Sequence, residues 1–252
     1  MPAERAQVIV LRVVEFSETS LVVTAFSREF GKLRAIAKGA RRPKGPFESA
    51  LDLLALCRIV FLRKSSDALD LLTEAKLIWR FRPAGRDLGS LYAAYYVAEL
   101  LTALTDEYDP HVELFDLAEA ILRGLSRGEP PNREVIAFEL GMLRELGMLP
   151  SLSACAACGQ EIAGGGRVAF GQLDGGVLCG QCRAGKRHVA LVTAGALKTM
   201  ARLAEAPGEG TRRIEIDAKT RGEIRGLLND YVAHLLGRRP QMHRYLTGTA
   251  RP

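Results

Sequence analysis

Residues 20–38 read SLVVTAFSREFGKLRAIAK and decide the fold class of the first third of the chain. Residues 20–27 are rich in β-branched side chains, and residues 32–38 alternate between charged and apolar ones, which is typical of strands. Three more strands are predicted outward from this pair, over residues 7–14, 51–62 and 69–78. Five short strands in about eighty residues fit a small closed barrel such as an OB-fold, and an SH3-like barrel fits almost as well.

From residue 87 onward the apolar residues recur at helical spacing. Helices are predicted over residues 88–104, 110–125, 133–146, 194–206 and 219–236. Asn132 is the predicted N-cap of the third helix, and Gly147 marks its end. We therefore predict an α+β protein with a barrel domain over residues 1–80 and a helical domain over residues 81–252. A glycine- and cysteine-bearing insert occupies residues 151–190 of the second domain.

Two CxxC pairs stand in this insert, Cys155-Ala-Ala-Cys158 and Cys179-Gly-Gln-Cys182, separated by twenty residues. This is the spacing of a structural zinc ribbon, and four thiolates leave no open position for catalysis. Residues 168–173 and 176–179 are predicted to pair as a hairpin around Asp174-Gly175. Two disulfides would need an oxidising compartment, and a thioredoxin-like centre would need one pair beside a βαβ unit. The sequence thus predicts one zinc ion per chain, with Cys57 left as a core residue.

Charge is unevenly distributed over a chain of net charge +6. Residues 1–80 carry 14 basic and 9 acidic residues, residues 91–150 carry 4 and 11, and residues 191–252 carry 11 and 6. One run, residues 28–44, has seven basic residues against one acid, partly on a strand face and partly on a Gly/Pro loop, as in nucleic-acid footprints. These seven predicted DNA contacts are Arg28, Lys32, Arg34, Lys38, Arg41, Arg42 and Lys44. The alternative is a solvated charged face. A second, weaker cluster is Arg238, Arg239 and Arg244.

Several function classes leave no motif in this sequence. There is no phosphate-binding GxxxxGK[ST] loop, no GxGxxG and no HExxH, and the four histidines are scattered, so we expect no enzyme. No apolar stretch reaches the length of a signal peptide or a membrane helix, so we expect a cytoplasmic protein.

Three motifs together resemble the RecO recombination-mediator family. They are residues 15–20 (EFSETS) with 30–32 (FGK) and 37–42 (AKGARR), residues 146–150 (LGMLP) leading into the first CxxC, and residues 236–240 (LGRRP). Some members of that family lack the cysteines, and this chain keeps all four.

The resemblance implies an N-terminal OB-fold, a helical domain and a zinc ribbon. It also implies binding of single- and double-stranded DNA, annealing of complementary strands, partnership with RecR, and loading of RecA onto DNA covered by single-stranded-DNA-binding protein (SSB). Two other classes stay open on the residues alone: a zinc-ribbon accessory protein of transcription or translation, and a metal-stabilised enzyme. Strand annealing without ATP would separate the first class from these two.

Overall fold

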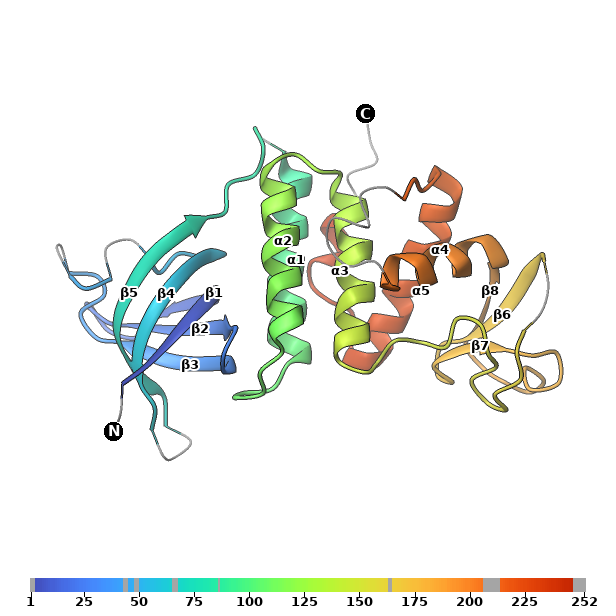
Figure 1. Cartoon of the computed structure of the whole chain (residues 1–252), viewed down its shortest axis with the longest axis horizontal. Helices are drawn as coiled ribbons and strands as arrows, with labels where there is room; N and C mark the ends of the chain where they lie inside the picture. The colour runs from blue at the N-terminus through green and yellow to red at the C-terminus, as the bar shows by residue number, and fades with distance from the viewer. Residues whose placement is uncertain are drawn as a thin grey trace. The chain divides into compact units, whose positions relative to one another are not determined.

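The computed structural model describes residues 3–42, 45–47, 50–64, 68–85, 87–162, 165–205 and 214–246. Contacts divide the chain into two compact units, Met1–Pro131 and Asn132–Pro252 (Figure 1). The two units are described in turn. Among the described residues, no helix has the length and apolar character needed to cross a membrane.

The first unit begins with a closed five-stranded barrel. Its strands are β1 (Ala3–Glu15), β2 (Leu21–Ser27), β3 (Gly31–Ala37), β4 (Ala55–Leu62) and β5 (Asp70–Arg80), in the order β1-β2-β3-β5-β4. All pairs are antiparallel except β3 with β5, which is parallel and closes the barrel. This order is that of an OB-fold, so the predicted fold class is confirmed.

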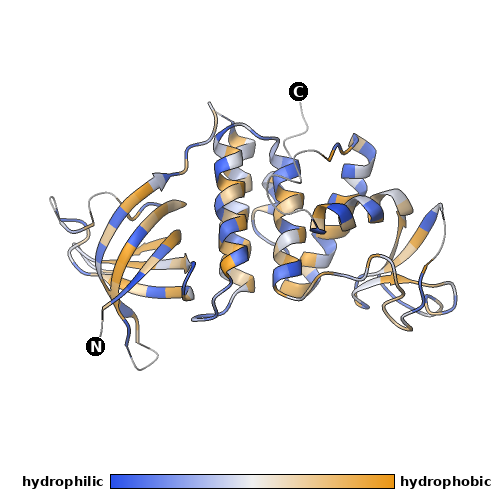
Figure 2. Ribbon diagram, viewed as in Figure 1, coloured by the Kyte–Doolittle hydropathy of each residue, from blue (hydrophilic) through white to orange (hydrophobic). Residues whose placement is uncertain are grey.

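The barrel interior is filled largely by small side chains. On β3 the burial alternates, with Leu33, Ala35 and Ala37 inside and Lys32, Arg34 and Ile36 outside, as the sequence predicted. Figure 2 shows the same interleaving of hydrophobic and hydrophilic residues along the strands. The buried cluster comprises Ala6, Val8, Val10, Val23, Ala25, Leu33, Ala35, Ala37, Phe47, Ala50, Leu51, Ala55, Cys57, Ile59, Phe61, Leu72 and Ala75.

Strand β1 changes its facing at a β-bulge. Val10 pairs with Ala25 and Arg12 pairs with Thr24, so Leu11 is an extra residue in the ladder. Before the bulge the even-numbered Val8 and Val10 are in the core, and after it Val13 packs there instead. The bulge therefore turns Arg12 outward.

Two helices, α1 (Leu88–Leu104) and α2 (Val112–Ser126), complete the first unit. A row of outward residues on neighbouring strands, Phe26, Ile9 and Leu56, is buried as deeply as the core. The ring of Phe26 lies 6.2 Å from that of Phe115 in α2, centroid to centroid. Helices thus cover one part of the outer barrel surface.

Polar contacts fix the same helices to the barrel. Gln7 Nε2 donates to Glu119 of α2 at 3.2 Å, and the backbone N–H of Tyr108 donates to the carbonyl of Lys32 at 2.9 Å. Gly31, with φ of +69°, lies so close to Asp109 that an added Cβ would be 1.9 Å from the Asp109 carbonyl oxygen. Only glycine fits there. The predicted domain boundary between residues 80 and 81 stays a prediction. The contacts group α1 and α2 with the barrel in one compact unit.

The second unit contains α3 (Pro131–Glu145), α4 (Ala194–Glu205), α5 (Ala218–Leu236) and the short α6 (His243–Leu246). The prediction of Asn132 as the N-cap of α3 is wrong, because the helix already begins at Pro131. A proline is favoured at the first helical position, where its missing N–H costs nothing. Within this unit the carboxylate of Glu139, fully buried, accepts from Arg225 at 2.5 Å.

A small three-stranded sheet of β6 (Arg167–Gly171), β7 (Gly176–Leu178) and β8 (Val189–Thr193) lies in the same unit, in the order β7-β6-β8. The predicted hairpin is confirmed, with Ala169 paired to Leu178 and Gly171 to Gly176. The strand β8 was not predicted. It pairs along all of β6, from Arg167 with Thr193 to Gly171 with Val189.

Candidate metal centre and nucleic-acid surface

The four cysteines of the two CxxC pairs converge in the second unit. The sulfur atoms of Cys155, Cys158, Cys179 and Cys182 all lie within 4.8 Å of one another. The Sγ atoms of Cys158 and Cys179 are 3.9 Å apart. Four sulfurs bound tetrahedrally at about 2.3 Å from a metal ion lie about 3.8 Å from one another. The geometry of the cluster therefore fits a four-thiolate metal centre.

Local backbone contacts bring the two pairs together. The N–H of Gly159 donates to the carbonyl of Cys155 at 2.8 Å, which closes the first turn, and Gly159 has φ of +74°. The N–H of Ala156 donates to the carbonyl of Val177 at 2.8 Å, which ties this turn to β7. The second pair follows directly after β7. The hairpin thus positions both pairs at its end.

The apolar core beneath the cysteines is very small. Its buried members are Cys155, Ala169 and Leu178, with partly buried Ile162, Cys179, Cys182 and Val189 around them. Phe170 and Val177 of the same hairpin pack instead into the core of the helices, so the turns that carry the cysteines have only this small cluster to order them. A bound metal ion would supply the missing stabilisation.

Hydrogen bonds prepare the cluster for a cation. The backbone N–H of Cys179 donates to the Cys155 sulfur at 3.4 Å, and backbone donors of this kind lower the pKa of the Cys155 thiol to about 6. Hydrogen bonds to Cys179 and then to Cys158 raise the pKa of Cys182 to about 12, since it holds the proton between neighbouring thiolates. Several negative sulfurs at this distance repel one another unless a cation lies between them.

Cys57 takes no part in this centre. Its thiol donates to the carbonyl of Ala50 at 2.9 Å inside the barrel, and burial raises its pKa to about 12. It is a core residue, as predicted.

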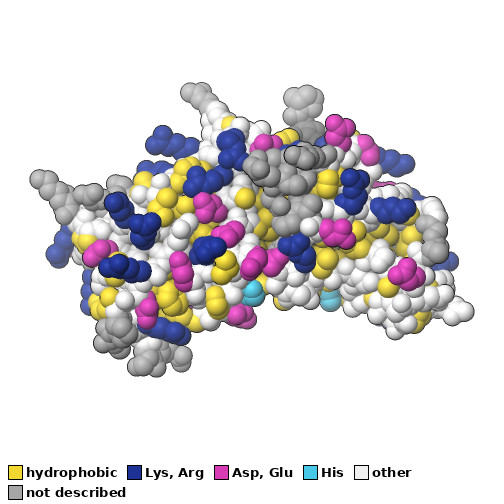
Figure 3. Space-filling model, in the orientation of Figure 1, with side chains coloured by type: hydrophobic (Ala, Val, Ile, Leu, Met, Phe, Trp, Pro, Cys, Tyr) yellow, Lys and Arg dark blue, Asp and Glu magenta, His cyan; other side chains and the backbone are white. Residues whose placement is uncertain are grey.

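A cationic surface lies on the outer side of β1, β2 and β3, away from the row that α2 covers. The strand register places Arg12 beside Thr24 and Thr24 beside Arg34, so two arginines flank a threonine across three strands. The next row along the strands is Val14, Val22 and Ile36. We call these two rows the open barrel face. Figure 3 shows Lys and Arg side chains gathered over the barrel, with acidic side chains interspersed.

A groove of about 410 Å³ runs along the open barrel face. Its lining residues are Arg12, Val14, Val22, Thr24, Lys32, Arg34, Leu69, Thr102 and Glu107. Arg34 is exposed and lies 3.7 Å from Glu107, a distance at which the ion pair is weak in water. Arg34 therefore remains able to contact a phosphate.

Two of the predicted DNA contacts are engaged within the first unit. Both Nε and Nη2 of Arg28 donate to Asp116 of α2, at 2.8 and 2.9 Å. The ammonium of Lys32 donates to the carbonyls of Thr102, at 2.8 Å, and Thr105, at the carboxyl end of α1, and its burial lowers its pKa. Arg28 and Lys32 thus join the barrel to its helices.

The loop after β3 holds three exposed cations of the run, Lys38, Arg41 and Arg42. Lys38 and Arg42 are exposed, and no ion pair engages either of them in the described part of the chain. Arg41 lies 3.1 Å from Glu15, and both side chains are substantially exposed. Lys44 lies outside the described residues. The loop therefore extends the open barrel face by three cations.

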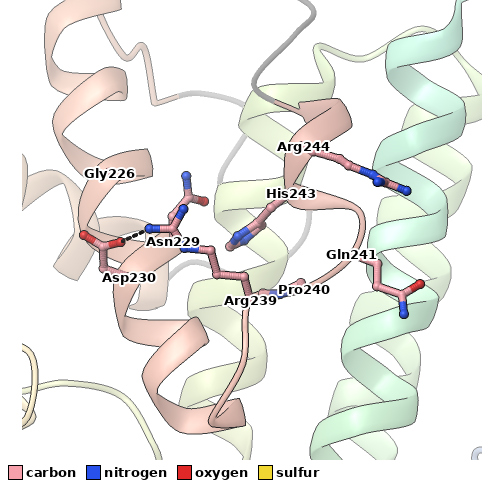
Figure 4. Close-up of a pocket in the computed structure, with 8 residues that line it drawn as sticks. All are labelled: Gly226, Asn229, Asp230, Arg239, Pro240, Gln241, His243 and Arg244. Carbon is pink, nitrogen blue, oxygen red and sulfur yellow. Dashed lines mark ion pairs between the residues drawn. The ribbon is translucent and has the colours of Figure 1, made fainter.

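Two residues of the second predicted cluster, Arg239 and Arg244, line a pocket of about 890 Å³ between α5 and the segment that follows it (Figure 4). Arg239 reaches back toward Asp230, 4.0 Å away, and the guanidinium of Arg244 lies 4.7 Å from the centre of the Tyr245 ring. Arg238 is exposed beside them. His243 points into the space between the two segments.

Sequence reasoning missed Arg12 of the open barrel face and the exposed Phe16 near it. Arg12 follows the bulge of β1, and Phe16 stands four residues later, just beyond the end of the strand, 64% exposed. The three aromatics that flank the basic run in the sequence, Phe26, Phe30 and Phe47, lie inside the first unit. Phe26 and Phe47 are buried, and Phe30 packs edge-on against Phe61 at 5.5 Å. The spacing Arg12-x-Val14-x-Phe16 was the available signal.

The sequence matches "Recombination protein O N terminal" over residues 1–81 and "Recombination protein O C terminal" over residues 85–244. It is 40% identical to a DNA repair protein RecO of Rhodopirellula baltica, over 94% of this chain and 97% of that protein. It is also 37% identical to a DNA repair protein RecO of Anaeromyxobacter dehalogenans, over 94% and 93%, and 36% identical to one of Myxococcus xanthus, over 92% and 91%. Taken with the barrel, the helices and the cysteine cluster, these matches show that the chain belongs to the RecO family of DNA repair proteins.

Proposed function

We propose that this chain is a non-enzymatic recombination mediator that binds DNA through its barrel. It holds single- and double-stranded DNA and anneals complementary strands. With RecR, it helps to load RecA onto DNA coated by single-stranded-DNA-binding protein. The observation that carries the proposal is the open barrel face, where Arg12 and Arg34 lie across three strands beside the loop cations Lys38, Arg41 and Arg42.

Electrostatics favours a polyanion at this face. An arginine or lysine that neutralises a phosphate releases a condensed counterion, and this term supplies most of the affinity for DNA without regard to sequence. Lys32 lines the groove and adds positive potential there, whereas Arg28 is paired with Asp116 and would have to exchange that partner for a phosphate. Lys44 belongs to the same run of sequence. Arg238, Arg239 and Arg244 form a second, separate contact in the other unit.

Annealing needs a protein that holds strands by their backbones and leaves base edges free to pair. Contacts from side chains on a strand face and an adjoining loop meet this requirement, because phosphate contacts carry no sequence information. The chain needs no nucleotide for such a reaction.

We assign zinc to the four-cysteine centre. Four thiolates with the spacing of a ribbon are typical of structural zinc, and a closed shell leaves the ion no catalytic position. Cysteines that stay reduced favour a reducing compartment, so we propose a cytoplasmic protein that works at the nucleoid, where its DNA lies.

Replacing Lys38, Arg41 and Arg42 together by Ala should flatten the salt dependence of DNA binding. Each phosphate contact contributes a slope of about −0.7 on single strands, so the loss of three contacts should change the slope by about two units. Annealing of complementary oligonucleotides, followed by a fluorescent reporter with and without SSB, should slow in parallel. Fluorescence anisotropy over a salt series measures the slope.

A matched control removes equal charge elsewhere. Lys198 and Arg202 on α4 and Lys219 on α5 are exposed, so their triple replacement by Ala should leave the slope and the annealing rate nearly unchanged. Equal effects of the two triple variants would show that only net charge matters and would refute the assignment of the barrel face.

A further inference from the structure

Phe16 is the most exposed of the large hydrophobic side chains in the described part of the chain, at 64%. A single exposed apolar side chain needs no explanation by itself. The position of Phe16 in the fold, however, indicates a role for its exposed ring. Phe16 lies just beyond the end of β1, two residues after Val14 and four after Arg12, and the register with β2 places Arg12 and Val14 on the outward side of the strand.

The turn that carries Phe16 is held in place by backbone hydrogen bonds. The N–H groups of Phe16 and Ser17 both donate to the carbonyl of Ser20, at 3.0 and 3.3 Å. The N–H of Arg41 donates to the carbonyl of Thr19 at 3.1 Å, which ties the basic loop to this turn. The ring is therefore presented on a fixed support beside cations, and little conformational freedom would be lost when a flat ligand covers it.

We propose that Phe16 stacks on an unpaired base of a single DNA strand whose phosphates contact the open barrel face and the basic loop. The proposal rests on the DNA binding proposed above. The four residue steps from Arg12 to Phe16 span about 13 Å if the chain stays extended past the end of β1, the length of about four stacked nucleotides. Val14, 41% exposed, and Val22 offer an apolar floor between the arginines and the ring.

This arrangement matches the way in which barrels of this kind bind single strands. A basic groove follows the backbone, and aromatic rings stack on bases without selecting a sequence. A duplex keeps its bases stacked on one another, so the ring would contribute to single strands only. Phe16 would thus give the barrel a preference for unpaired DNA that the cations alone do not provide.

The test compares ligands with and without bases. Fluorescence anisotropy would measure binding of the full chain to a 20-nucleotide oligo(dT), to an abasic oligomer of equal length and to a duplex. Phe16→Ala should weaken binding to oligo(dT) about tenfold, since base–aromatic stacking is worth that much or more. Binding to the abasic oligomer and the duplex, and the salt slope, should stay unchanged.

Two further variants complete the design. Phe16→Trp should restore oligo(dT) binding, and its added emission over that of the native Trp79 should be quenched by oligo(dT) but not by the abasic oligomer. Leu173→Ala removes a side chain of similar exposure, 53%, from the other unit and should change nothing. The stacking role would be overturned if Phe16→Ala lost affinity equally for oligo(dT) and the abasic oligomer, or if it lost affinity for neither of them. Either result would leave the proposed DNA binding intact. Failure of the unaltered chain to bind either oligomer would overturn the proposed function and this inference with it.

Discussion

Cys155→Ser or Cys182→Ser is expected to abolish tight metal binding and to unfold residues 151–190, while the barrel stays folded. A structural zinc ion contributes roughly 10 kcal/mol or more of apparent folding free energy in a small module. The buried cluster of Cys155, Ala169 and Leu178, even with Phe170 and Val177 packed against the helices, cannot replace that contribution. Metal analysis of the unaltered chain, purified without chelator, should give one zinc ion per molecule.

Hydrogen exchange can locate the loss. The amide of Ala156, which donates to the Val177 carbonyl, should lose its protection in both variants, whereas Val23 and Ala35 of the paired strands β2 and β3 should keep theirs. Cys57→Ala serves as the control, because this thiol lies in the barrel and its removal should leave the metal content at one. An intact ribbon with four free thiols and no metal would contradict the structural role.

A fragment of residues 1–80 is expected to be unfolded or aggregated, whereas a fragment of residues 1–131 should fold cooperatively. Phe26, Ile9 and Leu56 form an outward row that is fully buried, and Phe26 lies against Phe115 of α2. Exposing three such side chains costs about 1.5–3 kcal/mol each, a sum comparable with the whole stability of a small domain. Removal of α1 and α2 would also leave the ammonium of Lys32 without its carbonyl partners.

Circular dichroism and thermal melting of the two fragments would check this. A longer fragment carrying Phe115→Ala should melt at a lower temperature than the unaltered one, because a cavity forms beside Phe26. Cooperative melting of residues 1–80 alone would show that the barrel is an independent domain and that the helices are only attached to it.

Most elements could be predicted from the sequence because their patterns are local. The alternation in residues 32–38 and the apolar spacing of residues 88–104 identify a strand and a helix within a residue or two of their ends. The four metal-binding cysteines could also be predicted, because two CxxC pairs with ribbon spacing are recognised without any knowledge of the rest of the chain. The strand β8 was missed because it has only five residues, and because its pairing with β6 depends on residues elsewhere in the chain.

The cationic surface was harder to predict, since it depends on partners far away in the sequence. Arg28 and Lys32 have the spacing of free surface cations, but residues 88 and 70 positions later engage them. Arg12 stands in a strand that was predicted from its β-branched residues, and the facing of Arg12 depends on one extra residue. Charge counts therefore found the correct region of the chain but not every side chain on its surface.

Because Leu11 is an extra residue, the side chains of β1 alternate between the two faces of the strand in one way before it and in the opposite way after it. Its first half gives the helices an apolar side, and its second half gives the solvent a cationic one. A strand of strict period two would have pointed Arg12 into the barrel, because Val8 and Val10 point there. The two tasks of this strand therefore depend on Leu11 staying outside the ladder. Deletion of Leu11 would leave a regular ladder with Arg12 still opposite Thr24, whereas a ladder that took Leu11 in as an ordinary residue would reverse the facing of every side chain that follows.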